Sequence, residues 1–141
     1  IENLSMAEAG NFDICILGSS YRTVLTGNGI NVWIRNLDNE NAGLMILLSY
    51  IILGHPDWND QVIKIFSICD EGEMVSAQEK INNLVLVGRL PITEKNIEVI
   101  ERRQDVSFKS LVNKHSKDAG LTLIGFQIEQ STHEGVKFFE G

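Results

Sequence analysis

A helix-length apolar segment between two β-branched runs is the feature that most constrains how this chain folds. The run Ile30 to Arg35 (INVWIR) predicts a strand, and the segment Ala42 to Leu53 (AGLMILLSYIIL) predicts a helix. The run Val62 to Cys69 (VIKIFSIC) predicts a second strand, which only Lys64 and Ser67 interrupt. A strand, a helix and a strand in this order are typical of a parallel βαβ unit.

The same alternation continues through the second half of the chain. Apolar residues at three- and four-residue steps predict a helix after Asp70, and Gly120 closes a third predicted helix. The charged, alternating run 97–103 favours a half-exposed edge strand, and residues 121–126 predict a last strand. The chain is therefore predicted to be α/β, a three-layer doubly wound and mainly parallel sheet, with strand order about 3-2-1-4. The apolar positions of the second and third predicted helices are Met74, Ala77, Ile81, Leu84 and Val85, then Phe108, Leu111, Val112 and His115.

The length of 141 residues is typical of one domain, residues 1–141. Residues 1–29 are predicted to form a lead-in strand, at Phe12 to Leu17, and a loop. Residues 30–126 hold the core repeats, and residues 127–141 begin a truncated final helix. An initial Ile and an abrupt end lead us to expect a fragment of a longer protein.

Composition excludes several classes of function. Nineteen acidic against twelve basic residues give a net charge of −7, which argues against binding nucleic acid or anionic lipid. The segment 42–53 would be about 18 Å long as a helix, too short to insert across a membrane. Both cysteines, Cys15 and Cys69, lie in apolar runs, which predicts small core residues in a reducing compartment.

No catalytic constellation is visible in the sequence. Neither a phosphate-binding G-x-x-x-x-G-K-[ST] loop nor a G-x-G-x-x-G motif occurs. The histidines, at positions 55, 115 and 133, have no metal-ligand spacing. The acidic cluster Asp70, Glu71 and Glu73 could hold a cation, but opening a helix is the commoner use of such a cluster. We therefore expect no catalytic residue, no metal and no cofactor.

One ligand-binding alternative stays open at the carboxyl ends of the predicted strands. The strand–helix order is similar to that of universal stress proteins, so a stand-alone adenine-nucleotide-binding protein is the rival interpretation. Its contacts would be Arg35, Asn36 and Gly125. The glycine-rich loop of the nucleotide-binding members is incomplete here, because Gly125 is followed by Phe126 and by Ile128 rather than by a second glycine.

The segment 42–53 is apolar on all sides, which exceeds what one sheet face can cover. Two interpretations remain: a central helix between two neighbours, or a surface that binds a partner. The candidate interface or buried positions are Leu44, Met45, Leu48, Tyr50 and Ile52.

Several of these segments together resemble the second half of the cytosolic C-terminal domain of cation–chloride cotransporters. The strand motif is Asn31-Val32-Trp33, and the apolar helix runs from Gly43-Leu44 through Tyr50. Trp58 and Ile63-Lys64-Ile65-Phe66 follow at matching places, as does the segment 108–126 with His115-Ser116. The likeness spans Ile30 to about Phe126. The chain departs from the family pattern at two places: the family often has Trp-Trp where this chain has Trp33-Ile34, and Gly-Gly-Leu where it has Ala42-Gly43-Leu44. This chain also lacks the long phosphorylatable insertions of animal members. In this respect it is more similar to the prokaryotic, amino-acid-permease-like members.

The resemblance implies a non-enzymatic regulatory and dimerisation domain with a fold similar to universal stress proteins. Such a domain would lie at the cytoplasmic face of the cell membrane, below a transporter that couples chloride to sodium or potassium. Its implied partners are its own membrane domain, the first half of the C-terminal domain, and a second copy. It would not insert into the membrane.

Overall fold

A computed structural model describes residues 13–18, 26–38, 40–89 and 92–126. The chain divides into two compact units, one of Ile1–Thr23 with Phe126–Gly141 and one of Val24–Gly125. Every helix and strand among the described residues belongs to the second unit, Val24–Gly125.

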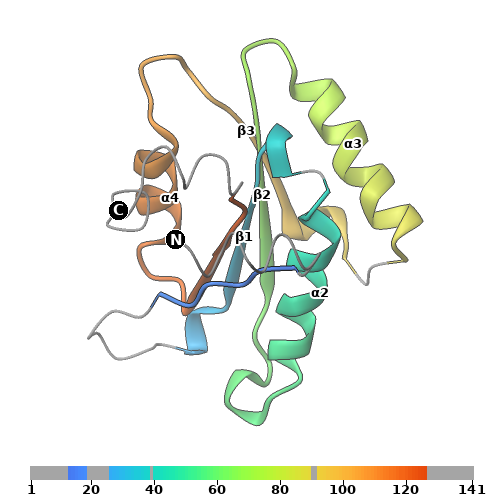
Figure 1. Ribbon diagram of the computed structural model, residues 1–141, viewed down its shortest axis with the longest axis vertical. Helices are drawn as coiled ribbons and strands as arrows, with labels where there is room; N and C mark the ends of the chain where they lie inside the picture. The colour runs from blue at the N-terminus through green and yellow to red at the C-terminus, as the bar shows by residue number, and fades with distance from the viewer. Residues whose placement is uncertain (1–12, 19–25, 39, 90–91, 127–141) are drawn as a thin grey trace. The chain divides into compact units, whose positions relative to one another are not determined.

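Four parallel strands form the sheet of this unit. They are β1 (Ile30–Ile34), β2 (Ile63–Cys69), β3 (Ile97–Glu101) and β4 (Leu121–Ile124). Their order is β3-β2-β1-β4, and the two central strands, β1 and β2, are buried along nearly their whole length (Figure 1). Fold class, parallel pairing and strand order are as predicted.

Three α-helices connect the strands. They are α2 (Ala42–Leu53), α3 (Met74–Val87) and α4 (Phe108–Ser116), and Gly54 ends α2. Figure 1 shows α2 and α3 on one side of the sheet and α4 on the other, which makes three layers. Short 3-10 helices occupy the connections: η1 (Thr26–Asn28), η2 (Asn36–Asp38), η3 (Pro56–Trp58) and η4 (Glu94–Asn96).

Alternate residues of the strands face two separate cores. On the α2 and α3 side, Val32 and Ile65 are fully buried among residues that include Ile46 of α2 and Ile81 of α3. On the α4 side, Trp33 stacks on Phe66 with ring centroids 4.5 Å apart, and the ring of Phe108 meets Trp33 edge-on at 5.8 Å. The side-chain period of two in a strand therefore divides each strand between both faces.

Three expectations need correction. Residues 13–18 form neither helix nor strand, because a short apolar run becomes a strand only where a neighbour accepts its hydrogen bonds. Cys15 is accordingly exposed, whereas Cys69 is buried as predicted. Met74 was predicted to belong to the apolar stripe of α3, but it is 45% exposed. It is the first residue of α3 and belongs to neither core cluster. The predicted final helix, with His133, lies outside the described residues.

Candidate functional site

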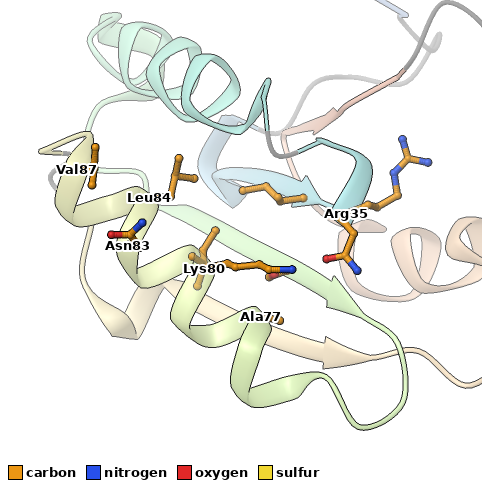
Figure 2. A pocket seen from close by; sticks show the side chains of 10 residues that line it. Arg35, Ala77, Lys80, Asn83, Leu84 and Val87 are labelled. Carbon is orange, nitrogen blue, oxygen red and sulfur yellow. The ribbon is translucent and has the colours of Figure 1, made fainter.

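The carboxyl ends of β1 and β2 border an open cavity of about 350 Å³ under α3. Its apolar walls come from Ile34 of β1 and from the inner face of α3, while Ser67, Lys80 and Asn36 supply polar groups. Figure 2 shows the Lys80 side chain extending from α3 along the cavity, while the guanidinium of Arg35 points away from it. The other α3 residues that line the cavity are Ala77, Ile81, Asn83, Leu84 and Val87.

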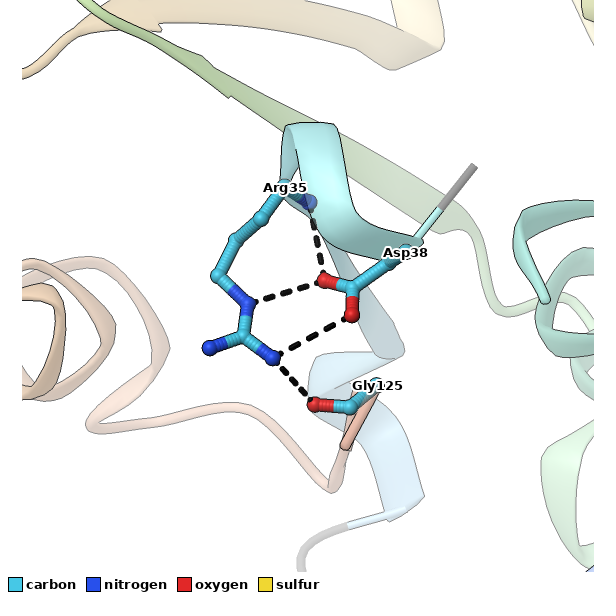
Figure 3. A network of polar contacts seen from close by, with 3 residues as sticks. All are labelled: Arg35, Asp38 and Gly125. Carbon is cyan, nitrogen blue, oxygen red and sulfur yellow. Dashed lines mark hydrogen bonds and ion pairs between the residues drawn. The ribbon is translucent and has the colours of Figure 1, made fainter. Parts of the chain in front are cut away.

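The carboxyl ends of β1 and β4, in contrast, are joined by a polar network (Figure 3). Arg35 donates from Nε to Asp38 Oδ2 at 2.9 Å and from Nη2 to Asp38 Oδ1 at 3.2 Å. The same Nη2 donates to the carbonyl oxygen of Gly125 at 2.7 Å. The backbone N–H of Arg35 also donates to Asp38 Oδ2 at 3.0 Å, so the carboxylate closes a turn as well as an ion pair.

This network fills the place where the strand order reverses. The side chain of Asp38 is 1% exposed, and that of Arg35 is 20% exposed. A Cβ at position 125 would overlap the Asp38 carboxylate, so only glycine leaves room for it. The guanidinium also lies 4.9 Å from the ring centroid of Phe108 on α4. Ligands of doubly wound sheets usually bind at such a point, but here the chain's own side chains occupy it.

The candidate nucleotide contacts are therefore only partly brought together. Arg35 and Gly125 meet directly, whereas the Asn36 amide donates instead to Glu73 Oε2 at 3.3 Å. Asp38 is a residue of this network that the sequence analysis did not single out, and its partner is Arg35. The three-residue spacing between these two opposite charges, directly after a strand, is the signal that could have found the pair.

The remaining polar candidates have structural contacts. His55 is exposed, and its Nδ1 accepts a hydrogen bond from the backbone N–H of Asp57 at 3.2 Å. The ring of His115 packs edge-on against the rings of Trp33 and Phe66. Within the described ranges, no group of three or more His, Cys, Asp or Glu residues could hold a metal ion.

The acidic cluster after β2 also binds other parts of the chain. Asp70 lies 3.4 Å from the Arg102 guanidinium, and Glu101 accepts a hydrogen bond from the Gly72 N–H at 2.6 Å. Burial raises the pKa of the Cys69 thiol, and the charges of Glu101, Glu73 and Asp70 raise it further. Cys69 is therefore a protonated core residue at neutral pH rather than a nucleophile.

The five positions proposed on the apolar helix divide between core and surface. Met45 is 7% exposed and belongs to the first core, against which Tyr50 and Ile52 also pack. Leu48 is half-buried, and Leu44 is 37% exposed. Two residues that the sequence did not single out, Leu47 and Ile51, are the most exposed of the helix, at 50% and 64%.

Comparison with known proteins leaves the chain without an identified relative: it matches no protein-family model, no curated protein and no solved structure. Of the helices that the structure describes, none is long and apolar enough to cross a membrane. The cotransporter resemblance stays a prediction based on the segments between residues 30 and 126.

Proposed function

We propose that this chain is a non-catalytic assembly domain that acts by packing one face of α2 against a second copy of the same protein. The observation that carries this proposal is the row Leu44, Leu47 and Ile51, spaced three and four residues apart and exposed along one side of the helix. The opposite side of α2 is already buried against the sheet, so this row is surplus to the chain's own core.

The surroundings of the row suit a protein interface. Leu48 is half-buried beside the row, and the helix carries no charged side chain from Ala42 to Leu53. Contiguous exposed apolar patches on folded domains commonly mark binding surfaces, because exposing them to water costs free energy. A twofold pair of α2 helices would cover the same row on both copies.

The cotransporter resemblance extends this proposal to a location and a parent protein. The domain would lie on the cytoplasmic face of the cell membrane, attached to a transporter that couples chloride to sodium or potassium. The membrane part would hold two copies close together, so that a weak contact between the domains suffices. The reading frame before Ile1 tests this directly, since a transporter requires several apolar stretches of about 20 residues there.

Sedimentation velocity tests the assembly role itself. The protein, together with the residues that precede it in its reading frame, is expected to form dimers with increasing concentration. The double substitution Leu47→Lys and Ile51→Lys should leave it monomeric. Val75→Lys is the matched control, because Val75 is 74% exposed but lies on α3. A monomer at every concentration, or a dimer that the double substitution leaves intact, would contradict the proposal.

The adenine-nucleotide alternative has weaker support, because Arg35 is engaged by Asp38 and Gly125 rather than free for a phosphate. Thermal unfolding in millimolar ATP or AMP tests it, since a ligand of the native state must raise the melting temperature. A shift that Arg35→Lys abolishes would favour the alternative over the assembly role.

A further inference from the structure

The cavity under α3 is bordered by a hydroxyl group that forms no hydrogen bond with the described part of the chain. Ser67 lies on the face of β2 that Ile63 and Ile65 bury in the first core, and it is itself only 7% exposed. Its hydroxyl makes no hydrogen bond within the described part of the chain. Every fully enclosed side-chain nitrogen or oxygen there has a partner, so the Ser67 oxygen must face the cavity space.

Ser67 is a polar residue on a strand face that is otherwise apolar. Ser67 pairs in register with Ile34 of β1, and an apolar residue at its position would continue the core. Because its oxygen is open to the cavity, water can hydrogen-bond to the Ser67 hydroxyl, and a ligand that displaces this water must replace that hydrogen bond. The hydroxyl is therefore available to a group that enters the cavity and accepts its hydrogen.

A positive charge lies along the same cavity. Lys80 of α3 lines it and, among the described residues, forms no ion pair. Arg35 also borders the cavity, but its guanidinium is directed to Asp38 and Gly125 (Figures 2 and 3). One uncommitted cation is thus available, and it can pair with one negative charge.

The cavity also limits how much negative charge can enter. Asn36, which lines the cavity, donates to the Glu73 carboxylate at 3.3 Å, and this negative charge would repel a second anionic group placed beside Asn36. The rest of the lining is aliphatic: Ile34, Ile81, Leu84 and Val87. The volume of about 350 Å³ falls within the range of small-molecule sites, roughly 300–1,000 Å³.

We propose that this cavity binds a small amphipathic monocarboxylate, with its carboxylate between the Ser67 hydroxyl and the Lys80 ammonium and its aliphatic chain along α3. The Ser67 hydroxyl donates to one carboxylate oxygen, and the Lys80 ammonium pairs with the carboxylate charge. The aliphatic chain replaces water against Ile81 and Leu84. This site is independent of the α2 surface, so the domain would both pair with a copy and respond to a metabolite of this class.

The test is a titration of the ¹⁵N- and methyl-labelled chain with butyrate, hexanoate and octanoate. Signals of Ile34, Ser67 and Ile81 are expected to shift, and affinity to rise about threefold to fourfold per added methylene until the cavity is full. Hexanol and hexylamine, which have the same carbon chain, should bind more weakly because they lack the negative charge. Absence of shifts at these residues at tens of millimolar octanoate would overturn the proposal.

Two substitutions separate the polar contacts from folding. Lys80→Met should lower hexanoate affinity about fivefold to tenfold and leave hexanol binding unchanged. Ser67→Ala removes only an oxygen and should lower hexanoate affinity several-fold, while the unfolding midpoint stays equal or rises. Lys95→Met is the control, because Lys95 is an exposed lysine on η4 that does not line the cavity. Unchanged hexanoate affinity in both Lys80→Met and Ser67→Ala would refute the site.

Discussion

At the scale of single residues, the buried polar side chains Asp38 and Asn31 belong to networks that join segments distant in sequence. Asp38 accepts hydrogen bonds from the backbone and guanidinium of Arg35, and Arg35 reaches Gly125, 90 positions further along the chain. On the other face, Ser116 accepts from Asn31 at 2.9 Å and from Trp33 Nε1 at 2.8 Å. Both central-strand networks therefore tie β1 to the last third of the unit.

Asp38→Asn is expected to lower the free energy of unfolding by about 2–4 kcal/mol, because it leaves the Arg35 guanidinium largely buried without its counter-charge. Urea unfolding followed by the fluorescence of buried Trp33 measures this loss. Asp105→Asn serves as the control, since Asp105 is exposed and forms no ion pair with the described residues. A loss below about 0.5 kcal/mol in Asp38→Asn would show that the pair contributes little.

The two cysteines are expected to differ in reactivity. Iodoacetamide at pH 8 should alkylate exposed Cys15 quickly and Cys69 only after unfolding, because Cys69 is buried and its thiol pKa is raised. Peptide mass spectrometry over time distinguishes the two. Equal alkylation rates in the folded chain would contradict the burial of Cys69.

The raised pKa of Cys69 also predicts how stability changes at alkaline pH. The folded chain keeps the thiol proton to a higher pH than the unfolded chain does, so the native state binds more protons above the ordinary thiol pKa of about 8.5. Its contribution to stability is complete below that pH and declines as pH rises above it. Unfolding curves between pH 8 and 10 should show this decline, and Cys69→Ala should show less of it.

At the scale of elements, α2 is an apolar helix whose two sides have different roles. Ile46 is fully buried in the first core, while its neighbour Leu47 is half exposed. A sequence that is apolar all round cannot show which side faces the sheet, because no amphipathic stripe distinguishes them. Which side of α2 faces the sheet depends on how the helix packs against β1.

This difference predicts unequal costs for two adjacent truncations. Ile46→Ala should cost about 2–5 kcal/mol of stability, since it leaves a cavity in a close-packed core. Leu47→Ala should change the free energy of unfolding of the monomer by no more than about 1 kcal/mol, because half of the Leu47 side chain is already exposed to solvent. Chemical unfolding of both variants measures the two values, and similar losses would mean that Leu47 is also core.

At the scale of the whole Val24–Gly125 unit, the two most buried strands lie at the centre of the sheet. β1 pairs with β2 and β4, and β2 pairs with β1 and β3. Hydrogen exchange should therefore be slowest at the amides of Val32, Ile65 and Phe66, which lie in these central strands. Faster exchange in β1 than in β3, whose residues are exposed or half-buried, would contradict this order of stability.

The sequence by itself determined the elements and the class of the fold. The hydrophobic periods of strands and helices are local properties of the sequence. The β-branched run 30–35 therefore predicted β1, and Gly54 predicted the end of α2, from neighbouring residues alone. The charged alternation of residues 97–103 likewise predicted an edge strand, and β3 covers Ile97–Glu101. The prediction of a strand in the N-terminal apolar run was wrong for residues 13–18, because a strand forms only beside a neighbouring strand that shares its hydrogen bonds.

Only the tertiary structure decided what the sites are. The closure of the β1–β4 crevice requires Arg35 and Gly125 to meet, and the cavity requires Ser67 and Lys80 to face the same space. Which side of α2 stays exposed depends on how the helix packs on β1. Each of these features depends on how segments distant in sequence pack against one another. A local pattern of hydrophobicity or charge does not contain that information.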